Sequence, residues 1–204
     1  MLRSHTASIL AASLLVSCAG AAQPAPTPKS SGAVDVKYTD DERARMGVCS
    51  GLTQVAWNAA RAKKNGEPKE KVLAAFRRVE GSAKLREFRD QLVAEAVTQV
   101  YEEDFDNNPW KSCVAFFKQC AAGLAEVREE RVGYGAYCAQ NSLIAGIAHD
   151  MKDAGVSREK AHEPFEAFKS QTPLKIVDRV YASSGGRSEA TVGEWTSCIE
   201  VSAE

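Results

Sequence analysis

Two parts of this chain resemble each other, and the internal repeat constrains the fold more than any other feature. When Cys49 is placed over Cys138, the following residues align without a gap as far as Phe76 and Phe165. Self-similarity of this kind indicates one structural unit used twice. The identical pairs are Cys49/Cys138, Ala56/Ala145, Ala59/Ala148, Lys63/Lys152, Gly66/Gly155, Glu70/Glu159, Lys71/Lys160 and Phe76/Phe165.

Two further motifs recur in the same order, although at shifted offsets. They are Val97-x-x-Val100-Tyr101 with Val177-x-x-Val180-Tyr181, and Trp110-x-x-Cys113 with Trp195-x-x-Cys198. We therefore predict a duplication, with a first helical repeat at 39–128 and a second at 129–204. The recurrence of both aromatic residues also predicts that Trp110 and Trp195 pack around equivalent disulfides.

The periodicity inside each repeat is helical. Thr39 and Glu42 form a capping-box pattern, which is typical of a helix start. Small or apolar residues follow at 49, 52, 56 and 59, the spacing of one helix face, and Gly66 is typical of a helix end. No segment alternates as a strand does. The predicted fold is all-α, with two tandem four-helix repeat units, each closed by one disulfide.

The repeat also predicts the disulfide pairing. Corresponding cysteines are Cys49 with Cys138 and Cys113 with Cys198, so pairing within each copy gives Cys49–Cys113 and Cys138–Cys198. Such bridges persist in an oxidising compartment. Cys120 has no counterpart, and we expect it to be a buried thiol. The alternative for Cys120 is an intermolecular disulfide or a reactive thiol.

The N-terminus is typical of an export signal. Arg3 precedes an apolar segment of about ten residues, which is too short to span a membrane. The tetrad Leu15-Val16-Ser17-Cys18 resembles the lipobox of bacterial lipoproteins, and the resemblance ends at Cys18. It implies a signal peptide at 1–17 and lipidation of Cys18. Ordinary signal peptidase cleavage near Ala19-Gly20-Ala21 is the alternative.

Residues 18–38 have the composition of a tether. Pro24, Pro26 and Pro28 stand in a background rich in Ala and Ser, which favours an extended chain. At ~3.1 Å per residue, such a segment reaches roughly 60 Å and would hold a folded domain away from a membrane. A mature terminus without any function is the alternative.

Charge and composition exclude some functions. The chain has 26 Lys and Arg against 27 Asp and Glu, so it lacks the basic excess of a nucleic-acid-binding protein. It has no Cys or His spacing of a zinc site and no glycine-rich phosphate loop. We expect no cofactor, no metal and no nucleic acid. The expected partners are a membrane, through the N-terminal lipid, and a protein that the sequence does not identify.

Candidate catalytic residues are few. His149 and His162 each precede an acid, but neighbours on a helix point about 100° apart, and the first copy has Ala60 and Leu73 at the aligned positions. We therefore predict no catalytic residue, and two dispensable histidines on the helix surface. The acids from Glu102 to Asp106 predict a solvated helix end rather than a calcium site.

Trp57 has Gly146 opposite it in the second copy, so the common core of the repeats does not require its side chain. Aromatic side chains are frequent in binding hot spots. We predict that Trp57 is an exposed aromatic residue that contacts a partner.

These features predict an exported helical binding or structural protein of the bacterial cell envelope, at the outer membrane or in the periplasm. One alternative is a periplasmic inhibitor or immunity-type protein, by analogy with small exported disulfide-bonded proteins. Another alternative is an enzyme with an unrecognised site near His149 or His162.

The first testable prediction concerns Cys18. Because the thiol is the attachment point of the lipid, Cys18→Ala should release the protein from the membrane or leave it unprocessed. Mass spectrometry of the mature N-terminus measures this directly. An unmodified chain that begins near Ala22 would contradict the prediction.

Overall fold

The computed structural model describes residues 36–76, 83–102 and 109–202, and in these ranges the chain is all-α, as predicted. The predicted signal peptide, Cys18, most of the tether and the acids after Glu102 lie outside the described residues. Two short 3-10 helices, η1 (Glu129–Arg131) and η2 (Glu200–Ser202), accompany the α-helices. The helices are α1 (Asp40–Lys64), α2 (Lys69–Phe76), α3 (Ala83–Glu102), α4 (Pro109–Gly123), α5 (Val132–Asp153), α6 (Arg158–Glu166), α7 (Gln171–Ala182) and α8 (Arg187–Ile199).

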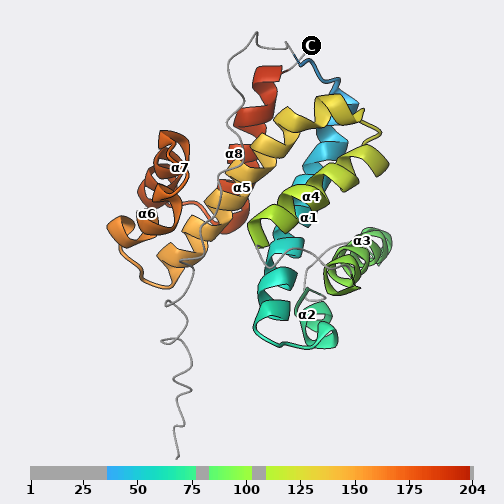
Figure 1. Ribbon diagram of the computed structural model, residues 1–204, viewed down its shortest axis with the longest axis horizontal. Helices are drawn as coiled ribbons and strands as arrows, with labels where there is room; N and C mark the ends of the chain where they lie inside the picture. Colours follow the sequence, from blue (N-terminus) through green and yellow to red (C-terminus); the bar gives the residue numbers. More distant parts are fainter. Residues whose placement is uncertain (1–35, 77–82, 103–108, 203–204) are drawn as a thin grey trace, which may run out of the picture.

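Four helices form a central stem and four form two arms (Figure 1). In the stem, α1 packs on α4 and α5 packs on α8, while α1 and α4 also contact α5. The first arm consists of α2 and α3, which pack on each other and on α1. The second arm consists of α6 and α7, which pack in the same way on each other and on α5. Figure 1 shows the two arms on opposite sides of the stem.

The two halves share hydrogen bonds at aligned positions. In each half, a lysine near the end of the first helix donates to a backbone carbonyl near the end of the third helix. A tyrosine near the end of the third helix donates in turn to the backbone carbonyl of a residue that follows the first helix. The bonds are Lys63 Nζ to Val100 O (2.9 Å), Lys152 Nζ to Val180 O (3.1 Å), Tyr101 Oη to Glu67 O (2.7 Å) and Tyr181 Oη to Val156 O (2.8 Å). The duplication that would explain these matches stays a prediction.

Each half contains one disulfide, and one of the two predicted pairings is wrong. Cys138–Cys198 joins α5 to α8, as expected. In the first half Cys49 is bonded to Cys120, not to Cys113. Cys113 is a buried free thiol, and burial raises its pKa, so it stays protonated at neutral pH.

The wrong pairing has a simple cause on α4. This helix carries two similar units seven residues apart, Trp110-Lys-Ser-Cys113 and Phe117-Lys-Gln-Cys120. Seven residues make about two turns, so both units lie on nearly the same face. In the structure Phe117 packs near Trp195, at 6.1 Å between ring centroids, and both rings belong to the stem core with Cys49 and Cys138.

Trp110 has a different environment from the one predicted. It lies with Cys113 in the core of the second half, together with residues of α5, α6 and α7. Only Trp195 is therefore found in the core that surrounds the cysteines of the disulfides. The unit of α4 that corresponds to Trp195 and Cys198 is Phe117 with Cys120.

The segment Val36–Tyr38, which we call the strap, fastens the start of the chain to both halves. The Tyr38 side chain is fully buried in the stem core. Its hydroxyl donates to the Arg131 carbonyl and accepts from the Gly135 amide at 3.4 Å. The Arg131 guanidinium lies 5.3 Å from the centre of the tyrosine ring and donates to the Lys37 carbonyl. The last residues of the predicted tether are therefore part of the folded core.

The strap marks one end of the stem. Thr39 caps α1 with the predicted capping box to Glu42, and Arg131, which precedes α5, pairs with the same glutamate at 2.7 Å. The two longest helices thus start side by side. Because α1 has 25 residues, it extends ~37 Å from this point. Both arms follow the far ends of these helices, away from the strap (Figure 1).

The second prediction concerns the bridges. Cys120→Ser should remove the disulfide that closes a 71-residue loop, and it should lower the free energy of unfolding by about 4 kcal/mol. Cys113→Ala should leave both bridges intact and lower it by no more than about 2 kcal/mol. Non-reducing peptide mapping and urea unfolding test both variants. A peptide linking Cys49 to Cys113 in the wild type would contradict the pairing.

The third prediction concerns pH and Glu42. Partial burial opposes its ionisation, but hydrogen bonds from Thr39 and Arg131 outweigh burial and hold the Glu42 pKa below its ordinary value of 4.5. At pH 7, Glu42→Gln should lower the free energy of unfolding by about 1–2 kcal/mol, since charged hydrogen bonds are lost. Because a lowered pKa makes the unfolded state bind more protons, this difference should shrink below pH 4.5 and vanish below the folded-state pKa.

The matched control is Glu129→Gln, since Glu129 is exposed on η1 close to the same end of the stem. Its effect on unfolding should be small and should not change between pH 7 and pH 3. If Glu42→Gln lowered the free energy of unfolding by the same amount at every pH, the charge of the Glu42 carboxylate would not contribute to stability at the strap.

Candidate functional site

A partly buried polar cluster joins the two halves at the junction of α1, α5 and α8. Arg187 donates through Nε to Asp150 Oδ1 at 2.8 Å and through Nη2 to Gln54 Oε1 at 3.1 Å. Gly146 makes room for this contact, because a Cβ atom there would lie 2.6 Å from Gln54 Oε1. Gln54 is 7% exposed, and its Nε2 has no hydrogen-bond partner in the described part of the chain. The cluster fixes the position of α1 relative to α8.

His149 is buried next to this cluster, which contradicts the prediction of a surface residue. Its Nε2 lies 3.2 Å from the Gly185 carbonyl in the loop before α8. Its Nδ1 lies 3.2 Å from Asp153 Oδ2, one turn later on α5, although without the geometry of a hydrogen bond. The i,i+4 spacing to Asp153 was visible in the sequence, whereas the loop that covers the imidazole was not. His149 therefore holds α5 to the loop between α7 and α8.

His162 also has a carboxylate partner that sequence reasoning missed. Its Nε2 lies 2.9 Å from Asp178 Oδ1, so the histidine of α6 bonds to α7 rather than to its neighbour Glu163. Arg158 Nε lies 3.8 Å from the same oxygen. His162 is partly buried, and its contact ties together the two helices of the second arm. The structure places each histidine in a separate contact between elements.

Trp57 is not the exposed residue that we predicted. It is partly buried, and its ring packs edge-on against Trp110 at 6.1 Å, while Trp110 packs on Phe168 at 5.1 Å. Its indole Nε1 is buried and has no hydrogen-bond partner among the described residues. Aromatic residues of the first half therefore pack into the core of the second half, and Trp57 belongs to this internal contact.

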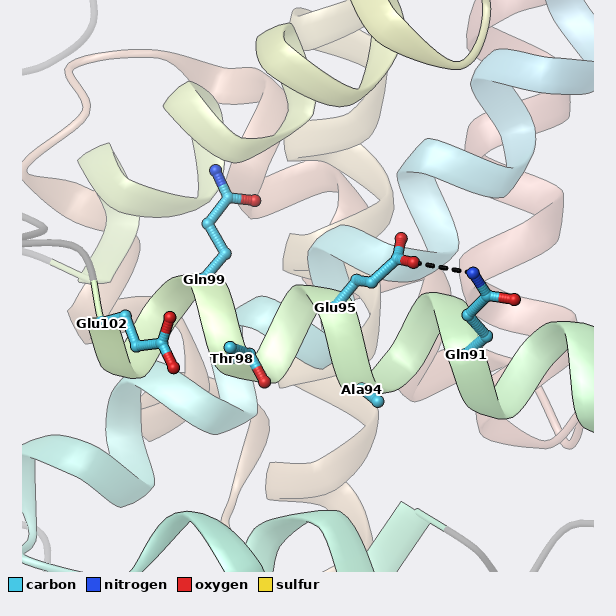
Figure 2. A pocket seen from close by; sticks show the side chains of 6 residues that line it. All are labelled: Gln91, Ala94, Glu95, Thr98, Gln99 and Glu102. Carbon is cyan, nitrogen blue, oxygen red and sulfur yellow. Dashed lines mark hydrogen bonds between the residues drawn. The ribbon is translucent and has the colours of Figure 1, made fainter.

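A hollow with a volume of about 560 Å³ lies on α3, on the first arm. Its lining residues all come from one face of that helix, as Figure 2 shows: Gln91, Ala94, Glu95, Thr98, Gln99 and Glu102. Gln91 donates to Glu95 at 3.0 Å. A smaller hollow of about 70 Å³ lies between α2 and α3. The side chains that line the 560 Å³ hollow are amides, carboxylates and small groups, which suit a contact surface better than an enclosed ligand site.

Among the described residues, no group of three or more His, Cys, Asp or Glu side chains could hold a metal ion. In the same residues, no helix is long and apolar enough to cross a bilayer.

Comparison with known proteins found no relative. No family model, no curated protein and no solved structure matches this chain.

The fourth prediction concerns the contribution of the two histidines to stability. His149→Ala should lower the free energy of unfolding by about 1–3 kcal/mol, because a buried side chain is lost and the Gly185 carbonyl loses a partner. His162→Ala removes a more exposed contact and should cost less than about 1 kcal/mol. Urea unfolding of both single variants measures the difference. Equal small effects would restore the prediction of two surface histidines.

Proposed function

We propose that this protein is an exported helical binding protein of the bacterial cell envelope, held to a membrane through a lipid on Cys18. Its two arms present the binding surface. Two features of the sequence support this proposal, the lipobox-like tetrad and the proline-containing segment that follows it. A third is structural, since the arms lie at the end of the stem opposite the strap. The disulfides support it, because four of the six cysteines form bridges, which are typical of exported proteins.

The observation that carries the proposal is the position of the strap. The chain enters the folded part at Tyr38, between the starts of α1 and α5, and both arms lie at the other end of these helices. A tether that ends at Tyr38 therefore attaches to the end of the stem opposite the arms. Surfaces on the arms then remain accessible to molecules at a distance from the membrane.

The arm surfaces indicate what kind of partner they fit. On the first arm, the exposed face of α3 carries Glu95 and Glu102 beside amide side chains. On the second arm, Glu163 and Lys175 are exposed. Both surfaces are polar and carry charge, so they fit a hydrophilic protein partner in the aqueous part of the envelope rather than a lipid or a small apolar ligand.

The test is site-specific photo-cross-linking in cells. A cross-linker at Gln91 on α3 or at Lys175 on α7 should capture a defined protein, whereas cross-linkers at the exposed stem positions Tyr137 and Val192 should not. Folding of each variant is checked by its disulfides. Capture from the stem positions alone would contradict the proposal.

The identity of the captured protein separates the proposal from its nearest alternative. If the arms capture one enzyme in a one-to-one complex and the purified chain inhibits that enzyme, the protein is an inhibitor. If they capture an envelope component without such inhibition, the binding role stands.

A further inference from the structure

We infer that the fold resists tension applied between its two ends, and that its two disulfides keep this tension away from both arms. The attachment of the N-terminal end, a lipid-anchored tether, rests on the proposed function. A partner bound to an arm would load that arm directly, so the disulfides protect the arms only against a pull that acts at the C-terminal end. The mechanical property itself follows from how the strap is packed and how the cysteines are connected.

The strap is the first point that resists a pull. Tension on the residues before Val36 reaches Tyr38, whose ring is buried in the core shared by α1, α4, α5 and α8. Extracting it breaks the contacts to the Arg131 and Gly135 backbone and the stacking under the Arg131 guanidinium. Arg131 is in turn paired with Glu42. The pull is therefore shared between the start of α1 and the start of α5.

The bond between Cys49 and Cys120 is the second point. Once the strap and the first turns of α1 have given way, the chain is covalently joined at Cys49 to the end of α4. Tension then passes through the disulfide and bypasses the 71-residue loop between the two cysteines. That loop contains the rest of α1 and the whole first arm.

The second disulfide acts in the same way in the other half. Cys138 lies near the start of α5 and Cys198 near the end of α8, so a pull toward the C-terminus bypasses the 60-residue loop between them. This loop contains the whole second arm. Between the two loops, only residues 121–137 carry the tension along the backbone.

The location of the bridges is what distinguishes this property from ordinary stabilisation. The stabilisation from a disulfide grows only with the logarithm of loop length, so a bridge placed nearer the arms would stabilise each half almost as well. A bridge in that place would leave most of α1 and α5 open to unravelling. Cys49 and Cys138 instead lie in the half of α1 and of α5 that is nearer the strap, so each bridge encloses an entire arm.

Single-molecule force spectroscopy tests the inference on the mature chain, held at Cys18 and at its C-terminus, without lipid. The oxidised protein should extend without releasing the arms. Reduction should add two increments, on the order of 250 Å and 210 Å at about 3.5 Å per residue for loops of 71 and 60 residues. Without any reductant, replacing Cys49 and Cys120 by Ser should add only the larger increment to the extension of the chain. Replacing Cys138 and Cys198 by Ser should add only the smaller increment.

The role of the strap is tested by the force at which the oxidised chain first unfolds in part. Tyr38→Ala should lower this force at least twofold, and Tyr38→Phe, which keeps the ring and loses only the hydroxyl bonds, should lower it less. The control Tyr137→Ala changes a tyrosine of α5 that is 38% exposed and should leave the force unchanged.

Two results would overturn the inference. One is an oxidised wild-type chain that extends by the full length of both arms. The other is a Tyr38→Ala variant, with its bridges intact, whose first event occurs at the wild-type force. Neither result would affect the lipid on Cys18, and an unmodified Cys18 would overturn the proposed anchoring without changing the force measurement.

Discussion

Four helices of the stem share one apolar core, and the positions of both arms follow from it. Met46 of α1, Phe117 of α4, Cys138 of α5 and Trp195 of α8 all contribute, and Tyr38 closes the core from the strap. The bridges Cys49–Cys120 and Cys138–Cys198 connect the same four helices. Because both long helices leave this core side by side, each arm follows the end of its long helix that lies away from the strap. The buried aromatic side chains and the two disulfides therefore stabilise the same end of the molecule.

The two halves meet through complementary differences between aligned residues. Met46 of α1 aligns with Gly135 of α5, where an added Cβ atom would lie 2.9 Å from the methionine sulfur. Trp57 aligns with Gly146, which makes room for the side chain of Gln54. In both cases α1 carries the large residue and α5 the glycine, so the helices approach closely without overlap. The halves also differ at the next turns of these helices, since the second half has the buried His149 where the first half has Ala60.

Local features were predictable because their causes lie within a few residues. The capping box at Thr39 and the left-handed glycines Gly66 and Gly155 are where the sequence places them. Cys138–Cys198 was predictable for a different reason, since the second half offers no competing cysteine. The environments of His149 and Trp57 were not predictable, because segments distant in sequence cover both side chains. The exposure of a residue on an amphipathic helix depends on what packs over it, and periodicity does not contain that information.

The sequence by itself determined that the described chain is helical and where its first helix begins. It also predicted two similar sets of four helices, each closed by one pair of cysteines. Helical period and capping are properties of neighbouring residues, so no distant contact was needed. Only the tertiary structure determined that Cys120 rather than Cys113 meets Cys49. Two nearly equivalent units lie on the same face of α4, and the choice between them depends on how far α4 is shifted along α1. In the observed register Phe117 lies beside Trp195, a contact between the halves that periodicity within α4 does not contain.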